Sequence, residues 1–167
     1  MKKVVIVRHA KAVPYGYDDD FTRTLRDRGK DDANRISSKL VADGIKADLI
    51  IASPAKRALK TAKIYAGNLD YPIHAIRIEE ELYEGITTQD FIDMLHELPE
   101  EVKTVFIFGH NPTVYYLTNN LLKLFNSDMP TCSTVGINFE IDSWKDVLAR
   151  SGKLAFNLMP RMFRSTI

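Results

Sequence analysis

The hydrophobic positions of the chain follow two alternating patterns. Short runs rich in β-branched residues are typical of strands that are buried on both faces of a sheet. Between these runs, apolar residues recur every three or four positions, as they do along one face of a helix. The expected strands cover residues 3–7, 48–53, 74–78, 104–109, 134–141 and 154–159. The expected helices cover residues 26–43, 53–67, 87–98 and 111–125.

This alternation predicts an α/β fold with a mostly parallel central sheet and helices on both of its faces. The last two strands are an exception, because residues 142–153 between them contain no clear long helix. We therefore expect these two strands to form an antiparallel pair at one side of the sheet. The 167 residues contain no repeat, low-complexity segment or long linker, which predicts a single domain over residues 1–167.

Several residues predict where the helices begin and end. Ser53 is expected to cap the helix at 53–67, with Pro54 in its first turn and Gly67 at its end. Gly44 is expected to close the preceding helix, and Pro112 lies just inside the start of the last one.

Composition and charge narrow the classes of function. The formal net charge is +1, so there is no overall positive field that would indicate nucleic-acid binding. Cys132 is the only cysteine, which excludes an internal disulfide and fits a reducing compartment. The N-terminal apolar run is too short for a signal peptide, and no stretch approaches the length of a membrane span. We expect a soluble, cytoplasmic protein without nucleic-acid or membrane partners.

Candidate chemistry gathers at the ends of three expected strands. The first strand runs directly into Arg8 and His9, the strand at 104–109 runs into His110, and Arg57 follows the strand at 48–53 by one helical turn. Ligands of open α/β sheets bind beyond the carboxyl ends of the strands. If the sheet brings these ends together, they form a cationic pocket without an acid. Arginine forks match the oxygens of a phosphoryl group, and the following helix starts, near Ser53 and Asn111, add N–H donors.

The two histidines suggest chemistry beyond binding. A neutral imidazole is a nucleophile that can carry a phosphoryl group, while arginines hold the charge on its oxygens. This scheme requires no metal or other cofactor. The alternative for either histidine alone is a structural hydrogen-bonding role, and Arg57 could instead be a solvated helix residue beside Lys56 and Lys60. The joint occurrence of His9, His110, Arg8 and Arg57 favours the functional interpretation.

Four segments carry a resemblance to a known family. "VRHAKA" (7–12), "DDFTRTLRDRG" (19–29), "SPAKRALKTA" (53–62) and "FGHNP" (108–112) stand in the order of the signature blocks of the histidine phosphatase superfamily. The short chain resembles in particular the SixA-type phosphohistidine phosphatases of that superfamily. The resemblance covers nearly the whole chain and implies a three-layer phosphoglycerate mutase-like fold.

The resemblance also implies roles for individual residues. His9 would be the nucleophile that becomes phosphorylated, Arg8 and Arg57 would bind the phosphoryl oxygens, and His110 would be the second histidine of the pocket. Two further substrate-binding candidates are Asn111 and Arg23; the alternative for Arg23 is a salt bridge to the aspartates at 18–20, which are expected to form a solvated loop.

The sequence departs from the family pattern in two places. Ala10 stands where the superfamily usually has glycine, so the loop must avoid left-handed backbone geometry there. Asn111 stands where the acid-phosphatase branch has an aspartate that donates a proton. Glu84, in Leu-Tyr-Glu, is the nearest match to the glutamate that other branches use as a proton donor.

A pocket without a firm acid favours cleavage of a P–N bond. An alkoxide leaving group has a conjugate acid with a pKa near that of water, about 15.7, whereas that of imidazole is about 6.5. We therefore expect a metal-independent phosphatase that acts on phosphohistidine of a signalling protein. The chain has few residues to build a lid, and a shallow site suits a phosphorylated protein side chain. The alternatives are a phosphatase of small phosphate esters and a phosphate-binding regulatory module without turnover.

Overall fold

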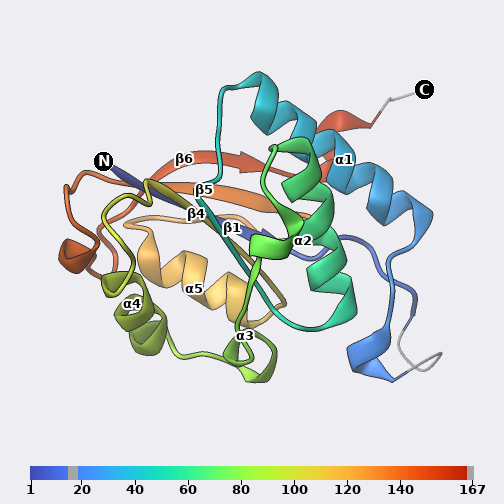
Figure 1. Cartoon of the computed structure of the whole chain (residues 1–167), viewed down its shortest axis with the longest axis horizontal. Coiled ribbons are helices and arrows are strands. Elements are labelled where there is room, and N and C mark those ends of the chain that lie inside the picture. The colour runs from blue at the N-terminus through green and yellow to red at the C-terminus, as the bar shows by residue number, and fades with distance from the viewer. Residues whose placement is uncertain (15–18, 165–167) are drawn as a thin grey trace.

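A computed structural model describes residues 1–14 and 19–164 of the chain. Its centre is a six-stranded sheet in the order β3-β2-β4-β1-β5-β6 (Figure 1). β3, β2, β4 and β1 are parallel, whereas β5 is antiparallel to β1 and β6 is antiparallel to β5. The mostly parallel sheet and the terminal antiparallel pair are thus confirmed. The strands are β1 (Lys2–Arg8), β2 (Leu49–Ala52), β3 (Arg77–Ile78), β4 (Thr104–Gly109), β5 (Thr134–Phe139) and β6 (Lys153–Leu158).

Helices cover both faces of the sheet, which gives the expected three layers (Figure 1). Successive side chains of β1 point to opposite faces. Val5 and Val7 pack in one core with α1 and α2, while Val4 and Ile6 pack in a second core with α4 and α5. The α-helices are α1 (Asp27–Ala42), α2 (Lys56–Asn68), α3 (Glu81–Glu84), α4 (Thr88–His96) and α5 (Thr113–Leu121). Short 3₁₀ helices are η1 (Asp20–Thr22), η2 (Ile73–Ala75), η3 (Trp144–Asp146) and η4 (Pro160–Phe163).

The predicted start of α2 is wrong. The helix begins at Lys56 with Ala55 as its N-cap, and Ser53 and Pro54 form the turn that precedes it. The Ser53 hydroxyl accepts the N–H of Ala55 at 3.2 Å, so it tightens this turn instead of capping the helix. At its other end α2 continues one residue past Gly67.

Among the other elements, α5 and β3 are shortened most in proportion to their expected lengths. α5 ends at Leu121, because Leu122 is extended and forms a parallel bridge with Gly152. In the expected strand at 74–78, only Arg77 and Ile78 pair with β2, while residues 73–75 form η2.

The start of α1 is packed against the segment that follows β1. Arg26 N–H donates to the Lys11 carbonyl oxygen at 2.9 Å, and a Cβ at Gly29 would collide with that same oxygen. Glycine is therefore required at position 29 for the close approach of the helix. This contact fixes the backbone two residues after His9. Among the residues that the structure describes, no helix combines the length and the apolar character needed to cross a membrane.

Candidate active site

The structure brings the three strand ends together, as the sequence predicts. β1, β4 and β2 are neighbouring parallel strands, so Arg8, His110 and Ser53 emerge at the same edge of the sheet. His9 N–H donates to the Gly109 carbonyl oxygen at 3.0 Å, and the ring centroids of His9 and His110 lie 5.3 Å apart. Arg57 lies in the first turn of α2, directly after the end of β2. The four principal candidates therefore share one site.

The His9 ring is held in a single orientation. Its Nδ1 lies 2.8 Å from the Ala10 carbonyl oxygen. A carbonyl can only accept, so Nδ1 carries the proton and the lone pair is on Nε2. Burial is the largest cause and lowers the pKa of His9 to about 4; the Ala10 hydrogen bond opposes it, and the positive charges of Arg57, Arg8 and Arg23 act in the same direction as burial. At neutral pH His9 is thus an uncharged imidazole with a free nitrogen lone pair.

His110 is bound through only one of its ring nitrogens. Its Nε2 lies 2.8 Å from the Ser53 hydroxyl, while its buried Nδ1 has no hydrogen-bond partner within the described part of the chain. Burial, followed by the charge of Arg57, lowers the pKa of His110 to about 3. Ser53 therefore orients His110. The sequence pattern suggested only a helix cap for Ser53, because nothing local to it indicates a contact with residue 110.

The backbone at Ala10 accommodates the departure from the usual glycine. Ala10 is fully buried, and its φ is not among the positive values of the described non-glycine residues. Its N–H donates to the Thr61 hydroxyl at 3.0 Å, and that hydroxyl donates to the Arg57 carbonyl oxygen at 2.8 Å. Thr61 thus connects the loop of His9 to the helix that carries Arg57.

Arg8 and Asn111 share one acceptor. Arg8 Nη1 and Asn111 Nδ2 each donate to the Met129 carbonyl oxygen at 3.0 Å. The Nε atoms of Arg8 and Arg57 are buried and have no hydrogen-bond partner among the described residues. Burial and the nearby Arg57 lower the pKa of Arg8 from its ordinary value. Buried donors without a partner are uncommon in folded proteins, and here they stand beside two neutral histidines.

The expectation of a pocket without an acid is wrong. Asp20 accepts from Arg57 Nη2 at 3.2 Å and from Arg23 Nη1 at 2.9 Å, and its main-chain oxygen accepts from Arg57 Nη1 at 2.6 Å. The Tyr83 hydroxyl also donates to the Asp20 carboxylate, at 2.9 Å. Burial would raise the pKa of Asp20, but the bonds from Arg23 and Tyr83 and the charge of Arg57 lower it overall. Asp20 is therefore a bound carboxylate, not part of a solvated loop.

For Arg23, the sequence left open a role in substrate binding and a salt bridge to the nearby aspartates. The salt bridge between Asp20 and Arg23 is confirmed, and it brings Arg23 to the same cluster as Arg57. Asp20 lies 37 residues from Arg57, which is why no local pattern pointed to their contact. Among the described residues, the cluster holds three guanidinium groups, those of Arg8, Arg23 and Arg57, against one carboxylate, that of Asp20. The excess of two positive charges suits a phosphoryl dianion.

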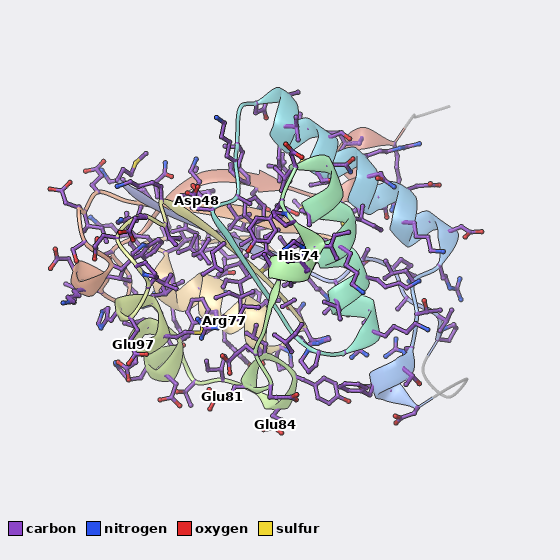
Figure 2. The ribbon with its side chains drawn as sticks, in the orientation of Figure 1. Asp48, His74, Arg77, Glu81, Glu84 and Glu97 are labelled. Carbon is purple, nitrogen blue, oxygen red and sulfur yellow. The ribbon has the colours of Figure 1, made fainter. Side chains whose placement is uncertain are left out.

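The structure brings Tyr83 to the site, but not Glu84. The Tyr83 ring packs edge-to-face against His110, with centroids 5.8 Å apart. Glu84 is exposed, and Figure 2 shows its side chain at the outer end of α3, pointing away from the body of the molecule. Its carboxylate makes no hydrogen bond or ion pair with another described residue. Among residues 1–14 and 19–164, no group of three or more His, Cys, Asp or Glu side chains could hold a metal ion.

Comparison with known proteins agrees with this geometry. The model of the histidine phosphatase superfamily (branch 1) matches residues 4–104, a range that contains Arg8, His9 and Arg57. A serine/threonine-protein phosphatase, mitochondrial Pgam5 of Drosophila persimilis, is 36% identical over 84 residues. That alignment covers 50% of this chain but only 29% of the fly protein.

Solved structures with the same fold cover nearly the whole chain. The protein histidine phosphatase SixA, in complex with tungstate, matches with a TM-score of 0.84 at 21% identity, over 97% of this chain and 99% of SixA. A Nakamurella multipartitia protein assigned to the SixA phosphohistidine phosphatases matches with a TM-score of 0.80 at 20% identity, over 95% and 96% of the two chains. The fold is therefore phosphoglycerate mutase-like, and the match to the family model shows that the chain belongs to branch 1 of the histidine phosphatase superfamily.

Proposed function

We propose that the chain is a metal-independent phosphatase that hydrolyses phosphohistidine on a signalling protein. The observation that carries this proposal is the state of His9: it is neutral, its Nε2 lone pair is free, and it lies beside Arg8 and Arg57, whose buried Nε donors have no partner among the described residues. Such a group can attack phosphorus while neighbouring guanidinium groups bind the phosphoryl oxygens.

In the first step, the Nε2 lone pair of His9 forms a bond to phosphorus as the P–N bond of the substrate breaks. The leaving imidazole, protonated on its other nitrogen, departs as a neutral ring. Arg8 and Arg57 hold the phosphoryl oxygens, and Asn111 helps to position Arg8 through their shared acceptor, the Met129 carbonyl. In the second step, water attacks phosphorus and the bond to His9 Nε2 breaks, which releases phosphate and returns His9 to its neutral form.

The acids near the site favour a substrate whose leaving group does not need protonation by a strong acid. Asp20 is held as a carboxylate by Arg23 and Arg57 and is therefore a poor proton donor at neutral pH. Glu84 is exposed and points away. An imidazole, with an unperturbed pKa of about 6.5, can leave without a strong acid, whereas an alkoxide cannot.

The similar proteins support a protein substrate. SixA is a protein histidine phosphatase, and Pgam5 of Drosophila persimilis is a serine/threonine-protein phosphatase. Their names agree in placing the phosphoryl group on a protein and differ in the atom that carries it. The bound carboxylate of Asp20 favours the histidine-linked group for this chain.

The test measures phosphate release, in the presence of EDTA, from a phosphohistidine protein, a phosphoserine peptide and an aryl phosphate. We expect the phosphohistidine protein to be hydrolysed much faster than the phosphoserine peptide. His9→Ala should reduce this rate by about 10⁴-fold or more, because it removes the nucleophile. A matched control is His74→Ala, since His74 is an exposed histidine of η2 and makes none of the contacts described at the site.

Three results would contradict parts of the proposal. Equal turnover of the phosphoserine peptide would remove the preference for P–N cleavage. Release from the aryl phosphate alone would assign the same chemistry to small esters. Retention of activity in His9→Ala would exclude His9 as the nucleophile.

A further inference from the structure

A second basic surface lies beside the candidate active site. It is a cavity of about 310 Å³ between the segment after β1, the start of α1, the loop before β5 and η4. Four of its lining side chains are basic, and no acidic side chain of the described residues lines it. The basic residues are Lys11, Arg28, Arg161 and Arg164. We call this cavity the basic cavity.

Most of this positive charge is not neutralised within the protein. Arg164 forms an ion pair with Asp32 at 3.2 Å, so its charge is largely balanced. The side chains of Lys11, Arg28 and Arg161 are exposed and form no hydrogen bond or ion pair within residues 1–14 and 19–164. Three positive charges therefore remain for a ligand.

The wall of the basic cavity that η4 forms is held in place. Arg164 binds Asp32 of α1, and Arg35 Nη1 of the same helix donates to the Phe163 carbonyl oxygen at 3.2 Å. Phe163 also packs against the core formed with α1 and α2. η4 is thus attached to α1 at two points, and the cavity between them is built into the fold.

The basic cavity and the candidate active site share two segments of backbone. Pro130 lines the cavity, and the carbonyl of Met129, the residue before it, binds Arg8. Lys11 lines the cavity two residues after His9. Since an extended chain spans about 3.5 Å per residue, a ligand that reaches from one site to the other needs only a few residues.

We propose that the basic cavity binds acidic side chains of the protein substrate, close to its phosphorylated residue. This proposal rests on the proposed function, because it concerns the same substrate. The cations come from three separate segments, and the lining also includes Pro130 and Met159. A carboxylate on an apolar stem fits this mixture of cationic and apolar side chains. Complementary charge would also speed the encounter of the two proteins and make it sensitive to salt.

The first test measures binding without turnover. A fluorescein-labelled peptide of six glutamates is titrated with the full-length protein, and fluorescence anisotropy is recorded at low and high salt. We expect binding at low salt that weakens about three- to tenfold in the double variant Arg28→Ala/Arg161→Ala, since each exposed charge pair contributes modestly. Lys30→Ala is the matched control, because Lys30 is an exposed cation of α1 that does not line the cavity.

The second test separates this proposal from the proposed function. The ratio of kcat/KM for a phosphohistidine protein with neighbouring acidic residues to kcat/KM for an aryl phosphate should fall by about the same factor in the double variant. If the wild-type protein hydrolyses both substrates but the ratio and the peptide affinity do not change, the basic cavity is not a substrate site and the proposed function stands. If the peptide binds as expected but no phosphate is released from any substrate, the proposed function fails while the cavity retains its ligand.

Two further outcomes would overturn the proposal. An equal loss of peptide affinity in Lys30→Ala would show that the peptide responds to the general charge of the surface. Binding of inorganic pyrophosphate that depends on Arg28 and Arg161, without binding of the peptide, would assign the basic cavity to a small anion.

Discussion

β1 carries a buried cationic side chain at its start and a cationic cluster at its end. At the start, Lys2 is 1% exposed, and its Nζ donates to the carbonyl oxygens of Glu100 at 2.7 Å and Val102 at 3.2 Å. The same Nζ lies 3.4 Å from the Glu100 carboxylate and 5.5 Å from the centre of the Trp144 ring. The charge of Lys2 is thus surrounded by acceptors.

The cluster at the end of β1 is incompletely bonded. Arg8 uses Nη1 on the Met129 carbonyl, but its buried Nε, the Nε of Arg57 and the Nδ1 of His110 have no partner among the described residues. Buried polar groups without partners cost free energy, so a fold retains them where a ligand supplies the missing bonds. The same strand therefore has a fully bonded cation at its start and, at its end, incompletely bonded cations that fit the proposed phosphoryl site.

The largest effect is expected from a substitution in the cluster at the end of β1. Arg57→Ala removes a guanidinium group from the proposed phosphoryl site and should lower kcat/KM for an aryl phosphate by roughly 10²- to 10³-fold. Lys56→Ala, one position earlier and exposed, is the control and should have little effect. Steady-state kinetics test this, with circular dichroism to confirm that the variant is folded. Full activity in Arg57→Ala would remove Arg57 from the proposed mechanism.

The second-largest effect is expected from a substitution at the start of β1. Lys2→Met removes two charge-assisted hydrogen bonds and the contact with Trp144, and it should lower the free energy of unfolding by about 2 kcal/mol. The activity of the folded molecules should not change, because Lys2 lies at the opposite end of β1 from the site. Urea denaturation measures the stability, with Lys3→Met, on the less buried neighbouring position, as control. A stable but inactive Lys2→Met variant would contradict the distinction between the two ends.

The sequence sufficed to predict the framework of the site because that framework depends on local patterns. Apolar runs located β1, β2 and β4, and the rule that ligands bind beyond the ends of parallel strands placed Arg8, His9 and His110 together. Their proximity in the structure, with ring centroids 5.3 Å apart for the two histidines, confirms that step.

The partners of these residues could not be predicted in the same way. Asp20, Ser53 and Tyr83 reach the cluster across sequence separations of 37, 57 and 63 residues, measured to the residues they bind. No periodic pattern encodes such contacts, which depend on how loops and short helices pack. Ser53 shows the difficulty most clearly, because a serine before a proline and a helix also fits the pattern of an N-cap.

The smallest expected effect, that of a single histidine, concerns the pH dependence of stability and sharpens the comparison without removing a charged partner. The pKa values of His9 and His110 are lowered to about 4 and about 3, chiefly by burial, from an ordinary value of 6.5. Between pH 6.5 and about 4 the unfolded chain therefore binds protons that the folded chain does not, and the free energy of unfolding falls as the pH falls. The lowered pKa of Asp20 acts in the same direction at more acidic pH, below its ordinary value of 3.8, because its stabilising bonds are lost when the carboxylate is protonated.

We expect the protein to be less stable at pH 5 than at pH 7 by about 1 to 2 kcal/mol for each of the two histidines. Urea denaturation across this range measures the slope of stability against pH. His110→Gln keeps a polar group near Ser53 but cannot titrate, so it should reduce the slope without shifting it to a different pH range. An unchanged slope in this variant would mean that His110 is already accessible to protons in the folded state. It would then resemble the satisfied cation at the start of β1 more than a neutral group held ready for a phosphoryl ligand.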